Sequence, residues 1–232
     1  VLSDRGALCG FVVYADGSAF DVLLAAVSAA GLAETLDAAG ADLTVFAPND
    51  AAFLATAQAL GFAGTDEAGA FSYIVQALTL LSGGGDPIPL LTSILTYHVS
   101  PGAKEATTVL GSSTIATLQG GDLTVSGTTL QDADPDLPDP TIIGTDNIVS
   151  NGIVHVIDGV LLPVDILPSD GSNDVDFLVL DAQAQGLDLG GDNDFVLGSG
   201  ADDSFEGGEG NDVLVGGAGT DTAIFSNSFG RY

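Results

Sequence analysis

Residues 44–53 read T-V-F-A-P-N-D-A-A-F, and this stretch decides the fold of the first part of the chain. Together with Leu43, its first residues form a β-branched and aromatic run that predicts a short strand. Pro48 is expected to stop that strand, because proline has no N–H to donate to a neighbouring strand. Asp50 predicts the start of a helix that runs to about Leu60, since its carboxylate can accept the free N–H groups of a first turn.

Helical patterns surround this stretch. Phe20 begins an apolar series with spacing i, i+3, i+4 and i+7, which predicts a helix. A capping-box-like Ser18 and Asp21 mark the start of this helix, and Gly31 is its expected stop. Further helices are expected at about 32–38, 70–81 and 90–96. From Thr107 onwards the pattern changes to short strands separated by Gly, Asn and Asp turns, at 114–118, 123–126, 142–143 and 153–157. Helices followed by strands predict an α+β domain.

Two more blocks accompany residues 44–53. They are Tyr97-His98 and residues 151–163, N-G-I-V-H-V-I-D-G-V-L-L-P. In this order the three blocks resemble the signature blocks of fasciclin-type domains, over about residues 18–166. The resemblance implies a compact β-wedge with flanking helices that contacts cells or matrix and does not catalyse a reaction. It also marks Tyr97 and His98 as a candidate adhesion contact, although packing is the alternative for His98 and His155.

The second part of the chain is a repeat of nine residues. Residues 207–215, G-G-E-G-N-D-V-L-V, fit the pattern G-G-x-G-x-D-x-U-x, and six such registers run from 171 to 224. Acidic residues fill the sixth position in five of the six, and Gln185 is the exception. The acidic residues are Asp176, Asp194, Asp203, Asp212 and Asp221. The eighth position carries Leu178, Leu187, Val196, Phe205, Leu214 and Ala223.

This repeat resembles the calcium-binding nonapeptides of RTX proteins. Glycine turns bring backbone carbonyls together and the aspartates add charged oxygens, which suits Ca²⁺ with its six to eight oxygen ligands. The expected site glycines are Gly190, Gly191, Gly198, Gly207, Gly208, Gly210, Gly216, Gly217 and Gly219. The resemblance implies a parallel β-roll with two nonapeptides per coil, which would pair Asp176 with Asp194, Asp194 with Asp212, and Asp203 with Asp221. Gln185 would weaken or abolish a site with Asp203, and the alternative to the whole interpretation is a solvated acidic linker.

The charge of the chain excludes several partners. Its 32 acidic and 3 basic residues give a net charge of −29, so nucleic acid and anionic membrane surfaces are not expected as direct partners. A hydrophobic content of 46% argues against disorder. The longest uncharged stretch, 68–85, contains four glycines and is too short for a membrane span. The composition changes near Pro163, which predicts a fasciclin-type domain at 1–166, a linker at 167–170 and a repeat region at 171–232.

Catalytic signatures are missing from the sequence. Neither His98 nor His155 belongs to an H-E-x-x-H motif, and no G-x-S-x-G occurs. The single cysteine, Cys9, cannot form an internal disulfide and is interpreted as a small buried residue. Residues 132–140 alternate carboxylates and prolines, which predicts a solvated surface loop, with calcium chelation as the alternative.

We therefore expect a secreted bacterial adhesion or surface-matrix protein that needs Ca²⁺, is not an enzyme, and has an unidentified cell-surface, matrix or glycan partner. The RTX resemblance implies export through a one-step channel that reads an uncleaved C-terminal signal, and it implies further strands beyond 232, so the repeat region is expected to be truncated. Three alternatives stay open: a matrix protein that self-associates through calcium, a small-ligand binder whose cleft is lined by the helical segment 61–92, and a fragment of a larger RTX enzyme.

Overall fold

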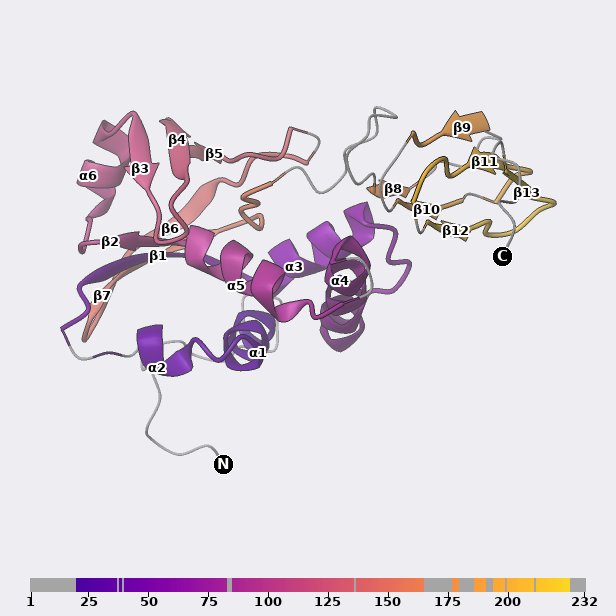
Figure 1. Ribbon diagram of the computed structural model, residues 1–232. Helices are drawn as coiled ribbons and strands as arrows, with labels where there is room; N and C mark the ends of the chain where they lie inside the picture. The colour runs from indigo at the N-terminus through magenta and orange to yellow at the C-terminus, as the bar shows by residue number, and fades with distance from the viewer. Residues whose placement is uncertain are drawn as a thin grey trace. The chain divides into compact units, whose positions relative to one another are not determined.

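The computed structural model describes residues 20–36, 38, 40–82, 85–135, 137–164, 177–179, 186–190, 194–198, 200–210 and 212–225. These residues form two compact units (Figure 1). The first is built mainly from residues before 165 and the second from residues after it, with the short segments 59–61 and 75–87 grouped with the second. The expected linker at 167–170 and Cys9 lie outside the described residues.

A four-stranded sheet is the centre of the first unit. Its order is β2 (Val99–Pro101), β1 (Leu43–Pro48), β7 (Gly152–Ile157) and β6 (Ile142–Val149). β1 pairs in parallel with β7, and the other pairs are antiparallel. β1 has strands on both sides, and five of its six residues are buried, which explains its continuous apolar run.

A smaller antiparallel sheet joins β3 (Thr114–Ala116), β4 (Asp122–Ser126) and β5 (Thr129–Gln131). In Figure 1, α1 and α2 lie on the opposite side of the four-stranded sheet from β3, β4 and α6. A cluster of buried side chains is shared by both sheets and two helices, and its members are Phe46, Tyr97, Val109, Ile115, Leu123, Leu130, Ile142, Ile157 and Leu161. The expected α+β wedge with flanking helices is therefore confirmed.

Six helices are described in the first part of the chain. They are α1 (Asp21–Ala29), α2 (Ala33–Leu36), α3 (Asp50–Ala59), α4 (Glu67–Leu81), α5 (Ile88–Tyr97) and α6 (Ala106–Gly111). The expectation that the chain is β from Thr107 onwards was wrong for α6, and β2 and β5 were not expected. These elements are short, and three to six residues carry too little periodicity to be recognised.

The predicted helix caps also need correction. Asp50 does not cap its own helix: the side chain of Asn49 accepts the N–H of Ala52 at 2.9 Å. Asp50 is fully buried and instead accepts the N–H groups of Val22 at 3.0 Å and Asp21 at 3.3 Å. The first turn of α1 is therefore capped by a residue 28 positions away, whereas the predicted cap Ser18 lies outside the described residues.

The second unit contains six strands of three residues. They are β8 (Phe177–Val179), β9 (Gly186–Asp188), β10 (Phe195–Leu197), β11 (Ser204–Glu206), β12 (Val213–Val215) and β13 (Thr222–Ile224). Each strand occupies positions seven to nine of a nonapeptide. The strands form two parallel sheets with the orders β12-β10-β8 and β13-β11-β9.

The register of these sheets has a period of eighteen residues. Val196 lies beside Leu178 and Leu214, and Phe205 lies beside Leu187 and Ala223. This is the spacing expected when two nonapeptides make one coil. Its thin core consists of Leu189, Val196 and Phe205, against which Leu187 and Leu214 pack. Ala223, an expected core residue, is exposed, and Leu189, at the first position of its repeat, is buried without having been predicted.

Candidate metal centre

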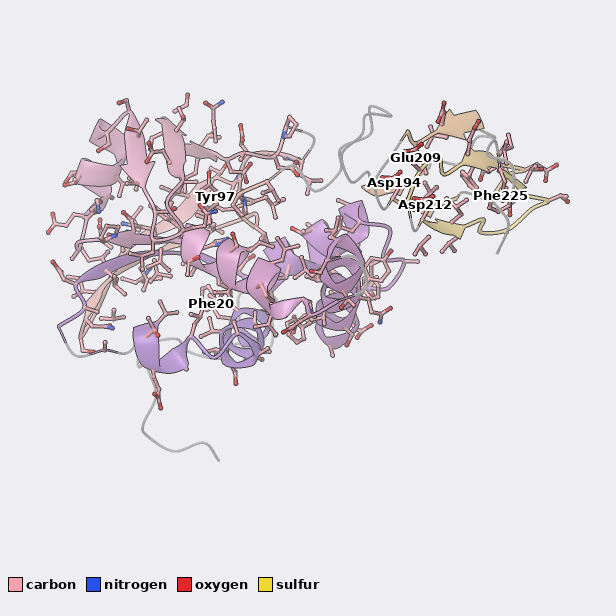
Figure 2. All side chains as sticks on the ribbon, viewed as in Figure 1. Phe20, Tyr97, Asp194, Glu209, Asp212 and Phe225 are labelled. Atoms are coloured by element: carbon pink, nitrogen blue, oxygen red, sulfur yellow. The ribbon has the colours of Figure 1, made fainter. Side chains whose placement is uncertain are left out.

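The eighteen-residue register brings the aspartates of alternate repeats together. The N–H of Asp194 donates to Oδ1 of Asp212 at 3.1 Å, and the N–H of Asp203 donates to Oδ1 of Asp221 at 3.0 Å. Figure 2 shows Asp194 and Asp212 side by side in the second unit. Two of the three predicted aspartate pairs are thus adjacent. The third pair includes Asp176, which lies outside the described residues.

Burial makes these carboxylates unusual. Asp194 is 2% exposed and Asp203 is 1% exposed, and their partners Asp212 and Asp221 are half-buried. A buried carboxylate is costly unless a positive group accompanies it. Lys104 is the one Lys or Arg within the described ranges; it belongs to the first unit, where its ammonium donates to Ser100 Oγ and the Pro101 carbonyl. These carboxylates offer oxygen ligands to a cation from solution.

Two consecutive glycines of one turn lie close to oxygen atoms of neighbouring residues. Gly208 has a φ of +83°, and a Cβ on it would overlap the carbonyl oxygen of Gly190 in the preceding coil. A Cβ on Gly207 would overlap the carboxylate of Asp212. Carbonyl and carboxylate oxygens thus lie next to consecutive glycines of one turn, and oxygen atoms are the ligands that Ca²⁺ prefers. The residues present fit this ion.

The other predicted glycines are distributed over the same turns. Close approaches also occur at three further glycines. A Cβ on Gly198 would meet Gly216 O, a Cβ on Gly216 would meet the Asp221 carboxylate, and a Cβ on Gly219 would meet Ala201 O. Gly190, Gly210 and Gly217 have positive φ angles. Gly191 lies outside the described residues. Calcium binding by each individual residue stays a prediction.

Tyr97 and His98, the candidate adhesion contact, are both 2% exposed. The Tyr97 hydroxyl donates to the Asp122 carbonyl at 3.0 Å, and burial raises the pKa of Tyr97 to about 12. His98 Nδ1 lies 2.8 Å from the Ile94 carbonyl, and its Nε2 accepts the N–H of Leu161 at 2.9 Å, so Nδ1 carries the proton. Burial lowers the pKa of His98 to about 4, which keeps it neutral. The geometry favours packing, and an adhesive contact through these side chains stays a prediction.

His155 likewise has a packing role. It is fully buried, stacks on Phe46 with ring centroids 5.8 Å apart, and bonds the Lys104 carbonyl through Nε2 at 2.9 Å. The rings of the two histidines thus bond to different backbone groups.

The acidic loop at 132–140 is less solvated than expected. Asp132 accepts the N–H groups of Leu162 at 2.8 Å and Asp134 at 3.0 Å, and burial raises the pKa of Asp132 to about 6. Asp134 is 4% exposed and accepts the N–H of Leu137 at 2.8 Å. These carboxylates fold back on the backbone, which explains why alternating acids here do not have to chelate an ion.

One acidic cluster was not predicted. Ligand oxygens of Asp21, Asp50 and Glu67 lie within 4.8 Å of one another. Burial and the neighbouring carboxylates of Asp50 and Asp21 raise the pKa of Glu67. Because Asp50 accepts the first N–H groups of α1, the cluster is explained as a helix cap. Sequence offered no signal for it, since the three residues come from three helices.

The fasciclin domain family model matches residues 18–163, well over half of the chain. The chain belongs to the fasciclin family. A second family model, the RTX calcium-binding nonapeptide repeat, matches residues 188–223. The fasciclin domain is therefore followed by RTX repeats, as the two resemblances indicated. Both families are in general non-enzymatic and typical of surface or extracellular proteins.

Two proteins of Synechocystis sp. are similar to this chain over more than half of its length. Protein sll1483 of Synechocystis sp. is 40% identical over 151 residues, covering 65% of this chain and 71% of that protein. The uncharacterized protein sll1735 of the same organism is 32% identical over 143 residues, covering 62% and 89%. A FAS1 domain pair from the insect cell adhesion molecule Fasciclin I aligns with a TM-score of 0.44 and 16% identity, covering 64% of this chain and 48% of that one. Across the described residues, no helix is long and apolar enough to cross a membrane.

Proposed function

We propose that this fasciclin protein is an exported, surface-attached adhesion or matrix protein whose RTX repeats fold when they bind Ca²⁺. The observation that carries the proposal is the burial of Asp194 and Asp203 in turns where the carboxylates of Asp212 and Asp221 accept their backbone N–H groups. Carboxylates at the sixth position of stacked repeats are oxygen ligands of the kind that Ca²⁺ binds.

The energetics support calcium-coupled folding. Among the described residues, the core of the repeats contains three buried apolar side chains, each worth about 1.5–3 kcal/mol, whereas ordering a residue's backbone costs about 1–2 kcal/mol. Residues 165–232 also hold 14 acidic residues and only Arg231 as a base, a net charge of −13. The free energy gained from apolar burial is therefore too small by itself to fold the repeats. Calcium neutralises the paired carboxylates and binds only the folded turns, so its binding free energy becomes folding free energy.

This dependence suits a protein that works outside the cell. Extracellular calcium modules bind at about 10⁻⁴–10⁻³ M, so the repeats would stay unfolded inside the cell and fold after export. In this role the fasciclin domain supplies the contact with a cell-surface, matrix or glycan partner, and the chain has no catalytic activity of its own. Self-association through calcium is the second candidate, favoured by the charge of −29, which keeps copies apart until cations neutralise it.

The proposal is tested by titrating the full chain with calcium while far-UV circular dichroism follows β content. We expect β signal to increase with calcium, and Asp194→Ala or Asp203→Ala to raise the midpoint. Glu209→Ala is the matched control, because it removes one carboxylate from the same turns at an exposed position. Equal β content in EDTA and in tenfold excess calcium contradicts the proposal, as does a control that weakens the response as much as the aspartate variants.

A further inference from the structure

Asp202 forms a hydrogen bond to the last described turn of the repeats. It lies at a position for which the nonapeptide pattern specifies no residue type. It is the fifth residue of its nonapeptide, next to the site residue Asp203. Its Oδ1 accepts the N–H of Thr220 at 2.8 Å, eighteen residues further along the chain. The side chain therefore connects two stacked turns, at 198–203 and 216–221.

Neighbouring bonds show what this connection fixes. The N–H of Asp203 donates to the Asp221 carboxylate at 3.0 Å, and the N–H of Thr222 donates to the Asp203 carbonyl at 2.8 Å. Asp221 thus lies between two residues, Thr220 and Thr222, whose N–H groups are both held by the preceding coil. A Cβ on Gly219 would lie 2.5 Å from the Ala201 carbonyl oxygen and 3.1 Å from Asp202 Oδ1, so the two turns are in close contact here.

A backbone connection is present in the other described pair of turns. There the N–H of Glu209 donates to the Gly190 carbonyl at 3.2 Å, and the bond joins backbone to backbone. In the pair of turns at 198–203 and 216–221, the Asp202 side chain makes a connection between the coils. A substitution of Asp202 therefore tests this pair of turns.

We infer that Asp202 is a positioning residue for the Asp203–Asp221 calcium site. This inference rests on the proposed calcium-coupled folding. By holding Thr220, Asp202 restricts the backbone immediately before Asp221, so less conformational freedom is lost when the ion binds. Asp202 and Thr220 are both exposed, so water and salt screen the charge of the carboxylate. The effect comes from the hydrogen bond, which an amide oxygen at the same place can also accept.

Two substitutions separate the hydrogen bond from the charge. Asp202→Ala removes both, and Asp202→Asn keeps an acceptor oxygen but removes the charge. In calcium titrations of the full chain we expect Asp202→Ala to raise the midpoint about five- to tenfold, the effect of losing one ordinary hydrogen bond. Asp202→Asn should stay within about twofold of the unsubstituted chain. Glu209→Ala and Glu209→Gln form the matched control pair, and both should leave the midpoint nearly unchanged.

Calorimetry adds a measurement that distinguishes a positioning residue from a ligand. We expect Asp202→Ala to bind the same number of calcium ions as the unsubstituted chain, with weaker affinity. The inference is overturned if Asp202→Ala titrates like the unsubstituted chain, if Asp202→Asn is as weak as Asp202→Ala, or if Asp202→Ala loses one bound ion. If the unsubstituted chain gains no β signal with calcium, the proposed function fails instead.

Discussion

Substituting Gly208 by alanine tests the stacking of the calcium turns most directly. Gly208 has a φ of +83°, and a Cβ there would overlap the Gly190 carbonyl oxygen. The left-handed conformation costs a non-glycine residue about 1–2 kcal/mol. Overpacking against a fixed neighbour adds about 1–3 kcal/mol. We therefore expect Gly208→Ala to destabilise the folded repeats by about 3 kcal/mol, near the middle of the summed range.

This loss of stability raises the calcium concentration that is needed to fold the repeats. Each tenfold increase in free calcium above the dissociation constant adds about 1.4 kcal/mol for each bound site. The structure describes two aspartate pairs, Asp194 with Asp212 and Asp203 with Asp221. With one ion bound at each pair, a deficit of about 3 kcal/mol is offset by about a tenfold higher calcium concentration. The midpoint of the titration should rise by that factor.

Far-UV circular dichroism of the full chain during calcium titration measures the shift, and Gly200→Ala is the control. Gly200 lies in the turn region of the same repeats, and a Cβ there meets no atom within 4 Å. Replacing glycine by alanine where alanine can adopt the native backbone conformation stabilises a protein by about 0.4–1 kcal/mol. The calcium midpoint of Gly200→Ala should therefore stay the same or fall slightly. Equal midpoints for Gly208→Ala and Gly200→Ala would refute the stacked-turn geometry.

A chain ending at Asp165 should unfold cooperatively on heating in EDTA, because the sheets and core cluster of the fasciclin domain are complete before it; a broad melt would contradict this. Asp50→Ala should lower the free energy of unfolding by about 2–4 kcal/mol, since it leaves two N–H groups of α1 without their acceptor, whereas Asp21→Ala should have little effect in the same chemical denaturation. His98 has its pKa lowered to about 4, so its neutral form stabilises the fold fully above pH 6.5, and about 3 kcal/mol is lost as the pH falls from 6.5 to 4. Asp132, with its pKa raised to about 6, has the opposite linkage and stabilises the fold as the pH falls through 6; Asp132→Asn should therefore steepen the acid loss of stability in denaturation curves, and an unchanged slope would count against this balance.

The sequence alone determined the parts of the protein that repeat or carry a local pattern. All six short strands of the second unit occupy positions seven to nine of the nonapeptides, and β1 follows from one apolar run ended near Pro48. Local patterns succeed here because glycine turns and proline act through their own backbone geometry, which does not depend on distant residues. The resemblance to RTX repeats, with two nonapeptides per coil, also predicted the two aspartate pairs that lie within the described residues.

Contacts between distant residues were decided only by the tertiary structure. Nothing near Asp50 in the sequence shows that it caps α1 rather than α3, because its hydrogen-bond partners lie 28 and 29 residues away. The burial of His98 depends on Leu161, 63 residues later, whose N–H holds the ring nitrogen. Asp202 occupies a position that the repeat leaves open, and its role depends on where the next coil places Thr220. A side chain's environment is set by whatever the chain folds against it, so these roles become visible only when the elements are packed.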